Sequence, residues 1–163
     1  MERTLAELMH RSSQIELQVA AIYDMLACCF FSDLRLSHFW MLFAEAERYH
    51  SLLINMQKVM VKHLQLDRER LAIWRLEIDQ ATEYLNAISE RLKGGWHPTV
   101  SEAFLLAHEI EGRSLEIQAR SLEFAGRSEE GELFAQLHEE DMGHRNKLLQ
   151  ARTQFDPSFS DEG

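Results

Sequence analysis

Residues 44–50, Ala-Glu-Ala-Glu-Arg-Tyr-His, indicate how this chain folds, because they set Glu47 and His50 three residues apart within an apolar pattern of helical period. Side chains three residues apart lie on one face of an α-helix, so both can point the same way. An unpaired charge among apolar neighbours is costly. A single Glu-x-x-His pair is common in helices, so its meaning depends on what else in the chain matches it.

A second half of the chain repeats the arrangement. Glu16 precedes Glu47 by 31 residues, and Glu111 precedes Asp141 by 30. Equal spacing brings the side chains of two antiparallel helical hairpins to the same height. A Glu from each of two helices and a carboxylate–His pair from each of the other two make the ligand set of a dinuclear metal site in a four-helix bundle. The predicted metal ligands are Glu16, Glu47, His50, Glu111, Asp141 and His144.

Amphipathic helices account for most of the chain. The expected elements are a helix from Thr4 to Phe31, a helix after the Ser32-Asp33 cap, a helix from the Asp67 cap to Leu92, a helix opened by the capping box Thr99-Val-Ser-Glu102, and a helix after Gly126 and Ser128. The third helix spans roughly 39 Å, enough to carry the chain back along a bundle. We therefore predict one all-α domain over residues 1–155, a four-helix bundle with an additional crossover helix between its two hairpins, followed by a polar tail at 156–163.

Composition narrows the classes of partner. The chain has 163 residues, 27 acidic against 17 Lys and Arg, and a net charge of −10. Nucleic acid and anionic membrane are therefore poor partners. Neither a signal peptide nor a transmembrane span is apparent, so a cytoplasmic location is expected.

The ligand types predict which metal binds. Six carboxylate and imidazole ligands suit two Fe ions, with Mn possible, whereas structural zinc usually takes four ligands and tolerates sulfur. Two points stay open: Glu140 could replace Asp141 as a ligand, and His108 or His138 could join the site, although packing or support of a ligand is the expected role of these two histidines. Tyr23 and Tyr49 could hydrogen-bond to ligands or supply an electron, but core packing is the expected role of both.

The chain resembles the rubrerythrin branch of the ferritin-like superfamily. The resemblance is carried by four short stretches: Ile15-Glu16 with Tyr23 seven residues on, Ala44-Glu-Ala-Glu47-Arg-Tyr-His50, Ala107-His-Glu-Ile-Glu111, and Glu139-Glu-Asp141-Met-Gly-His144. It implies a ferritin-like bundle with a non-haem di-iron centre, often dimeric. The rubredoxin-like domain common in that branch is absent from this sequence, so a separate electron donor is implied. Asp141 stands where the family has Glu, and Ser114 stands where its peroxidases often have another Glu.

Three functions are compatible with these patterns. The leading one is a di-iron oxidoreductase that reduces peroxide or O₂, and the resemblance implies that it acts as a homodimer. The second is a ferroxidase that handles iron, and the third is a helical bundle without catalysis, whose polar stripe is a hydrogen-bond network or a docking surface. Iron-dependent stabilisation that is lost with the ligands would separate the third from the first two.

Overall fold

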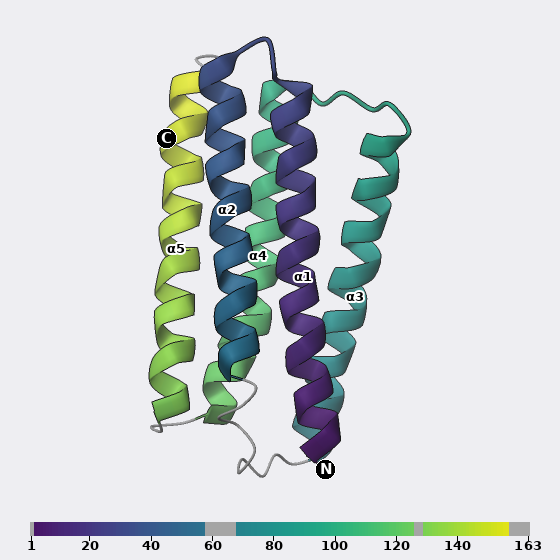
Figure 1. The fold of residues 1–163 in the computed structure, drawn as a ribbon, viewed down its shortest axis with the longest axis vertical. Coiled ribbons are helices and arrows are strands. Elements are labelled where there is room, and N and C mark those ends of the chain that lie inside the picture. The colour runs from purple at the N-terminus through teal and green to yellow at the C-terminus, as the bar shows by residue number, and fades with distance from the viewer. Residues whose placement is uncertain (1, 58–67, 126–128, 157–163) are drawn as a thin grey trace, which may run out of the picture.

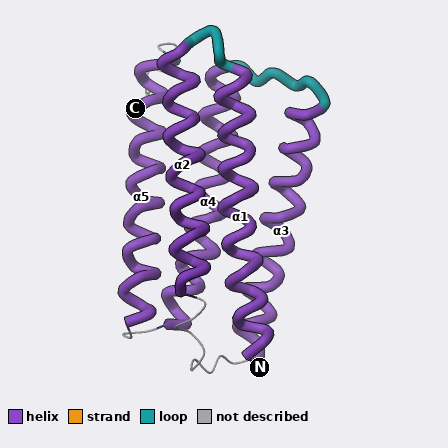
Figure 2. The backbone as a smooth tube through the Cα atoms, in the orientation of Figure 1, coloured by secondary structure: helices purple, strands orange, loops and turns teal. Residues whose placement is uncertain are grey.

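The part of the chain that the structure describes is all-helical. The structure is a computed structural model that describes the backbone of residues 2–57, 68–125 and 129–156 and, within these ranges, every side chain except those of 2–4, 57, 115–125, 129–134, 137 and 141. Its elements are α1 (Glu2–Cys29), α2 (Leu34–Gln57), α3 (Arg68–Lys93), α4 (Val100–Ala125) and α5 (Glu129–Phe155), drawn in Figures 1 and 2. The predicted all-α class and order of five helices are therefore confirmed, and no strand occurs in the described ranges.

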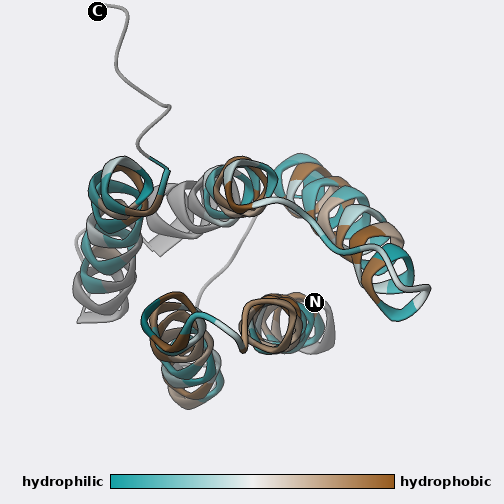
Figure 3. Cartoon of the chain, turned by 90° about the horizontal axis from the view of Figure 1, so that it is seen from above, coloured by the Kyte–Doolittle hydropathy of each residue, from teal (hydrophilic) through white to brown (hydrophobic). Residues whose placement is uncertain are grey.

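The helices form a bundle of two layers. Helices α1 and α2 pack against each other as an antiparallel hairpin, and so do α4 and α5. Seen from above in Figure 3, the first hairpin makes one layer and α3, α4 and α5 make the other. Helices α2 and α4 run in one direction and α1 and α5 in the other, so side chains from both hairpins can meet between the layers.

Helix α3 is the crossover helix that the sequence predicts. It runs along the bundle from one end to the other and packs against α1 and, less extensively, against α4. Its buried side chains are Leu71, Trp74, Ile78, Ala81, Leu85, Ile88 and Leu92. These are the seven residues of the predicted apolar seam, and their spacing of three and four places them on one helical face.

Two of the predicted helix starts are made by the expected side chains. Asp33 Oδ1 accepts hydrogen bonds from the backbone N–H groups of Arg35 and Leu36, both at 3.1 Å, and so caps α2. At the start of α4, Thr99 Oγ1 accepts from the backbone N–H of Glu102 at 3.2 Å, and Glu102 Oε2 accepts from that of Thr99 at 2.7 Å. This reciprocal pair is a capping box. The proposed cap at Asp67 and the junction at Gly126 and Ser128 lie outside the described residues.

Helix ends agree with the predictions less uniformly. Helix α3 ends as expected, in a Schellman motif: Trp96 N–H donates to Arg91 C=O at 3.0 Å, Gly95 N–H donates to Leu92 C=O at 3.1 Å, and Gly95 has a φ of 91°. Helix α1 ends at Cys29, two residues before the predicted end at Phe31. Phe31 lies in the turn with 73% of its surface exposed, so the apolar run Phe30-Phe31 does not continue the helix.

One continuous core fills the space between the layers. Trp40, Trp74, Tyr23 and Phe104 are its largest fully buried side chains. Aromatic rings from both layers meet there, since Trp40 of α2 lies 5.1 Å from Phe104 of α4 between ring centroids. None of the described helices is both long and apolar enough to span a membrane. The predicted tail lies outside the described residues apart from Asp156.

Candidate metal centre

Helix α2 brings a carboxylate and an imidazole into the core side by side. Glu47 and His50 are each 1% exposed, and Glu47 Oε2 lies 3.3 Å from His50 Nδ1. Their spacing of three residues places them on the face that also carries the buried Trp40 and Phe43. Glu47 and His50 are therefore inside the bundle, as predicted.

Helix α5 supplies a second imidazole from the other layer. His144 Nδ1 lies 3.2 Å from Glu47 Oε1 and 3.9 Å from Glu111 Oε2. The rings of His50 and His144 are stacked with their centroids 5.1 Å apart. Ligand atoms of Glu47, His50 and His144 all lie within 4.8 Å of one another, so these three residues could hold one cation. We call them the Glu–His cluster.

Two other predicted carboxylates are buried but stand outside this cluster. Glu16 of α1 and Glu111 of α4 are 2% and 1% exposed. Acidic side chains are almost never buried to this extent unless a partner compensates their charge. Tyr23 donates a hydrogen bond from its hydroxyl to Glu111 Oε1 at 2.5 Å. Glu111 approaches the cluster through His144, and neither Glu111 nor Glu16 belongs to the group of three residues whose ligand atoms lie within 4.8 Å of one another. The side chain of Asp141 lies outside the described residues.

Glu140 contacts the cluster from the side of α5. Its Oε2 lies 3.2 Å from His50 Nε2, and Gln136 Nε2 donates to its Oε1 at 2.9 Å. A third of the Glu140 side chain is exposed, so it lies at the edge of the buried group. Glu140, which the sequence left as the alternative to Asp141, is therefore within reach of the centre.

The two additional histidines do not belong to the cluster. Arg145 Nη2 donates to His108 Nε2 at 3.2 Å, and His108 is absent from the group of ligand atoms. Burial, followed by the charges of Arg145 and Arg152, lowers the pKa of His108. His138 is half-buried and is likewise absent from the group of ligand atoms.

The geometry of the buried atoms fits a cation. Glu47 Oε1 and His144 Nδ1 approach to 3.2 Å, yet neither has a hydrogen-bond partner, so their angles are not those of a hydrogen bond. His50 has a carboxylate oxygen close to each ring nitrogen, and a neutral imidazole carries a single N–H. A cation among these atoms would supply the partner that Glu47 Oε1 and His144 Nδ1 lack. Carboxylate and imidazole ligands suit Fe, Mn or Zn.

Electrostatics keep Glu47 ionised without a metal. Burial alone raises the pKa of this carboxyl, but the side chains of His144 and His50 lower it to about 2. The carboxylate is therefore charged at neutral pH and available to a cation. A metal site needs deprotonated ligands, so this residue meets the requirement.

The structure confirms core packing for Tyr23 and contradicts it for Tyr49. Core packing was expected for both, but Tyr49 is 49% exposed, because its position on α2 faces away from the other layer. Tyr23 is fully buried and also donates to Glu111, so packing is only part of its role. The seven-residue spacing from Glu16 to Tyr23 placed them on one helical face, yet no sequence pattern linked Tyr23 to α4.

The centre draws its residues from helices that are far apart in the sequence. Glu47 and His50 come from α2, His144 from α5 and Glu111 from α4. Convergence of such residues in a buried place is the usual basis for identifying a functional site. The chain matches no family model, no curated protein and no solved structure.

Proposed function

We propose that this chain is a ferritin-like protein of the rubrerythrin type that binds a pair of iron ions and reduces peroxide or O₂. The observation that carries the proposal is the position of Glu47 between two imidazoles, with ligand atoms of all three residues within 4.8 Å in the core. Charged groups that are buried in a protein core are usually paired with one another or bound to a cation. Mn is the alternative metal.

A second ion is proposed because more carboxylates are buried than one cation needs. Glu16 and Glu111 come from α1 and α4, the two helices that do not supply the Glu–His cluster. Glu140 contacts His50 at 3.2 Å and could complete the ligand set on the side of α5, as Asp141 could in its place. A carboxylate from each of the four helices, with two imidazoles, is the donor set of known dinuclear bundles.

The protein side chains hold and tune such a pair. Iron, when bound, would supply the electrons that reduce peroxide to two waters, with two protons taken up. The buried carboxylates balance the charge of the cations, and Tyr23 fixes the orientation of Glu111. A separate donor protein is proposed to return the electrons. A homodimer and a cytoplasmic location remain predictions of the sequence.

Metal binding and turnover test the proposal directly. An anaerobic Fe²⁺ titration is expected to saturate at about two ions per chain. Mixing the loaded protein with peroxide is expected to oxidise the iron faster than mixing it with O₂. His50→Gln is expected to weaken this binding, and His97→Gln, which changes an exposed histidine outside the cluster, is the matched control. Failure to bind iron, or binding without oxidation by either oxidant, contradicts the oxidoreductase.

The same experiment separates oxidoreductase from ferroxidase. A ferroxidase that feeds a store would continue to take up and oxidise iron well beyond two ions per chain, and storage requires a many-subunit cage. Light scattering that gives a small oligomer, together with iron uptake that stops at saturation, favours the oxidoreductase. Continued uptake in a large assembly favours iron handling.

A further inference from the structure

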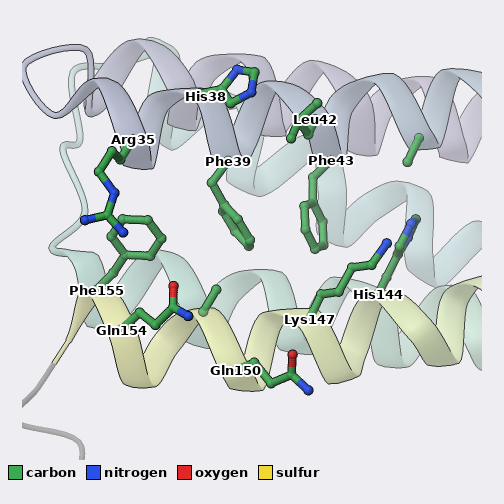
Figure 4. A pocket seen from close by; sticks show the side chains of 12 residues that line it. Arg35, His38, Phe39, Leu42, Phe43, His144, Lys147, Gln150, Gln154 and Phe155 are labelled. Atoms are coloured by element: carbon green, nitrogen blue, oxygen red, sulfur yellow. The ribbon is translucent and has the colours of Figure 1, made fainter.

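A pocket opens between α2 and α5 next to the candidate metal centre. Its volume is about 550 Å³, within the 300–1,000 Å³ that small-molecule sites typically occupy. The two helices come from different layers and touch at few points, which leaves room between them. Figure 4 shows the pocket lined by side chains from both helices, with Phe155 and Arg35 at one end and His144 at the other.

The charge of the lining is opposite to that of the chain. Arg35, His38, His144 and Lys147 are among the twelve residues that line the pocket, and none of the twelve is acidic. The whole chain has a net charge of −10. A concave surface whose ionisable side chains are all basic attracts anions even when the rest of the protein repels them.

Lys147 is the basic side chain of the pocket that is best placed to bind the anionic group of a ligand. Its ammonium group lies beside the ring of His144 at the inner end of the pocket (Figure 4). No described carboxylate forms an ion pair with it. Arg35, by contrast, lies over the ring of Phe155 at 5.6 Å, so it already has a partner at the outer end.

The space between these two ends is apolar. Phe39, Leu42 and Phe43 face it from α2, and Ala151 and Phe155 face it from α5. Leu42 is 56% exposed, which leaves apolar surface in contact with water. An apolar ligand body would remove this surface from water, at roughly 25 cal/mol for each Å² buried.

We propose that this pocket binds an organic carboxylate with an apolar body, its carboxylate at Lys147 and its body over Phe39 and Phe43. The ligand class follows from a lone cation at one end and apolar side chains along the rest. The proposal goes beyond metal binding and does not depend on it, because the residues assigned to hold the ligand, Lys147, Phe39 and Phe43, are not members of the Glu–His cluster. A small carboxylate held there lies next to the centre at which oxidation or reduction is proposed.

Decanoate is a suitable probe, with 1-decanol as its uncharged equivalent and acetate as a headgroup without the apolar body. Calorimetric titration of the full chain, in chelator and again after iron loading, is expected to show one decanoate per chain, tighter than either control. Lys147→Gln keeps most of the side-chain stem and removes the charge. It is expected to weaken decanoate binding roughly tenfold and leave 1-decanol unchanged.

Two further variants test whether decanoate binds in this pocket and not elsewhere on the protein. Lys93→Gln, on the exposed end of α3, is the matched control and is expected to bind decanoate like the parent. Ala46→Leu fills the inner end of the pocket without changing its charge and is expected to abolish binding of both decanoate and 1-decanol. Circular dichroism checks that each variant folds.

Three results overturn the proposal: decanoate that does not bind, decanoate that binds Lys147→Gln as tightly as the parent, or an affinity that falls with Arg35→Gln instead. A dimer whose interface covers the pocket and excludes decanoate also overturns it. Decanoate binding in chelator combined with absence of iron binding would leave this inference standing while the proposed function fails, so the two failures are distinguishable.

Discussion

The hydroxyl of Tyr23 on α1 donates a hydrogen bond of 2.5 Å to Glu111 Oε1 on α4, and both side chains are buried. Hydrogen bonds from a hydroxyl to a carboxylate are short and about twice as strong as those between neutral groups. The Tyr23 ring is held in turn by stacking on Trp40 and by an edge contact with Phe43, each at 5.7 Å between centroids. This chain of contacts connects the aromatic core to a proposed metal ligand.

Removing the Tyr23 hydroxyl tests this connection. Tyr23→Phe keeps the ring but takes away one donor from a buried carboxylate, which costs about 1–3 kcal/mol. We expect urea unfolding of the metal-free protein to give a free energy of unfolding lower by this amount. Tyr49→Phe is the control, because Tyr49 is half-exposed on α2. Equal stability of the two variants would show that the hydrogen bond contributes nothing.

Loss of an imidazole from the Glu–His cluster is expected to weaken metal binding. His144→Gln removes the ring whose Nδ1 faces Glu47 Oε1 at 3.2 Å, and His50→Gln removes the ring on the other side of the same carboxylate. Losing a metal ligand should weaken binding at least as much as the 10–100-fold typical of losing a group that supports one. Titration with Co²⁺, followed by its visible absorption, measures the affinity. His97→Gln, an exposed change outside the cluster, should bind Co²⁺ like the parent.

Local sequence patterns were enough to predict the helices. The seam from Leu71 to Leu92 and the caps at Asp33 and Thr99 depend on residues at most four apart, and such interactions are legible in one chain. The end of α1 was less predictable because apolar Phe30 and Phe31 suit either a helix or a buried turn. Boundaries depend on a few tenths of a kcal/mol per residue, which packing easily overrides.

The site was predictable only in outline. Periodicity placed Glu16, Glu47 and Glu111 on faces directed at the core, and all three are buried. Which atoms come into contact depends on how the helices rotate and shift against one another. The spacing of residues within a hairpin constrains only the height of their side chains along the bundle. Tyr23 and Glu140 therefore gained their partners from the tertiary arrangement. The three-residue spacing to His144 favoured Asp141, and the contact of Glu140 with His50 could not be read from any spacing.

Glu140 and Asp141 can be separated by paired substitutions. Glu140→Gln keeps the size of the side chain that lies 3.2 Å from His50 Nε2 and removes its charge. Because that oxygen is already in contact with the cluster, we expect this variant to lose more affinity for Co²⁺ or Fe²⁺ than Asp141→Asn. Calorimetry at matched metal concentrations measures both. A larger loss for Asp141→Asn assigns the ligand role to Asp141 and would leave Glu140 as a partner of His50 only.

The charge on Glu47 predicts how stability changes with pH in the metal-free protein. Its pKa is about 2, against an ordinary value of 4.5, because the stabilisation by His144 and His50 exceeds the penalty of burial. Because the pKa of Glu47 is lower in the folded state than in the unfolded state, its ionised form stabilises the native state at pH values above about 4.5. This stabilisation is lost as the pH falls from about 4.5 toward 2. The shift implies a loss of roughly 2 kcal/mol between pH 5 and pH 3.

Urea unfolding in chelator at several pH values measures that loss. Glu47→Gln cannot ionise, so its free energy of unfolding should fall by roughly 2 kcal/mol less than that of the parent over the same interval. Glu83→Gln, an exposed change on α3, should follow the parent and so accounts for the loss of one surface carboxylate. If all three proteins lose stability equally, Glu47 is not held ionised by His50 and His144. A carboxylate that both imidazoles stabilise resists protonation in the folded chain and takes up a proton more readily in the unfolded chain. Acid therefore favours unfolding of the parent more than unfolding of Glu47→Gln.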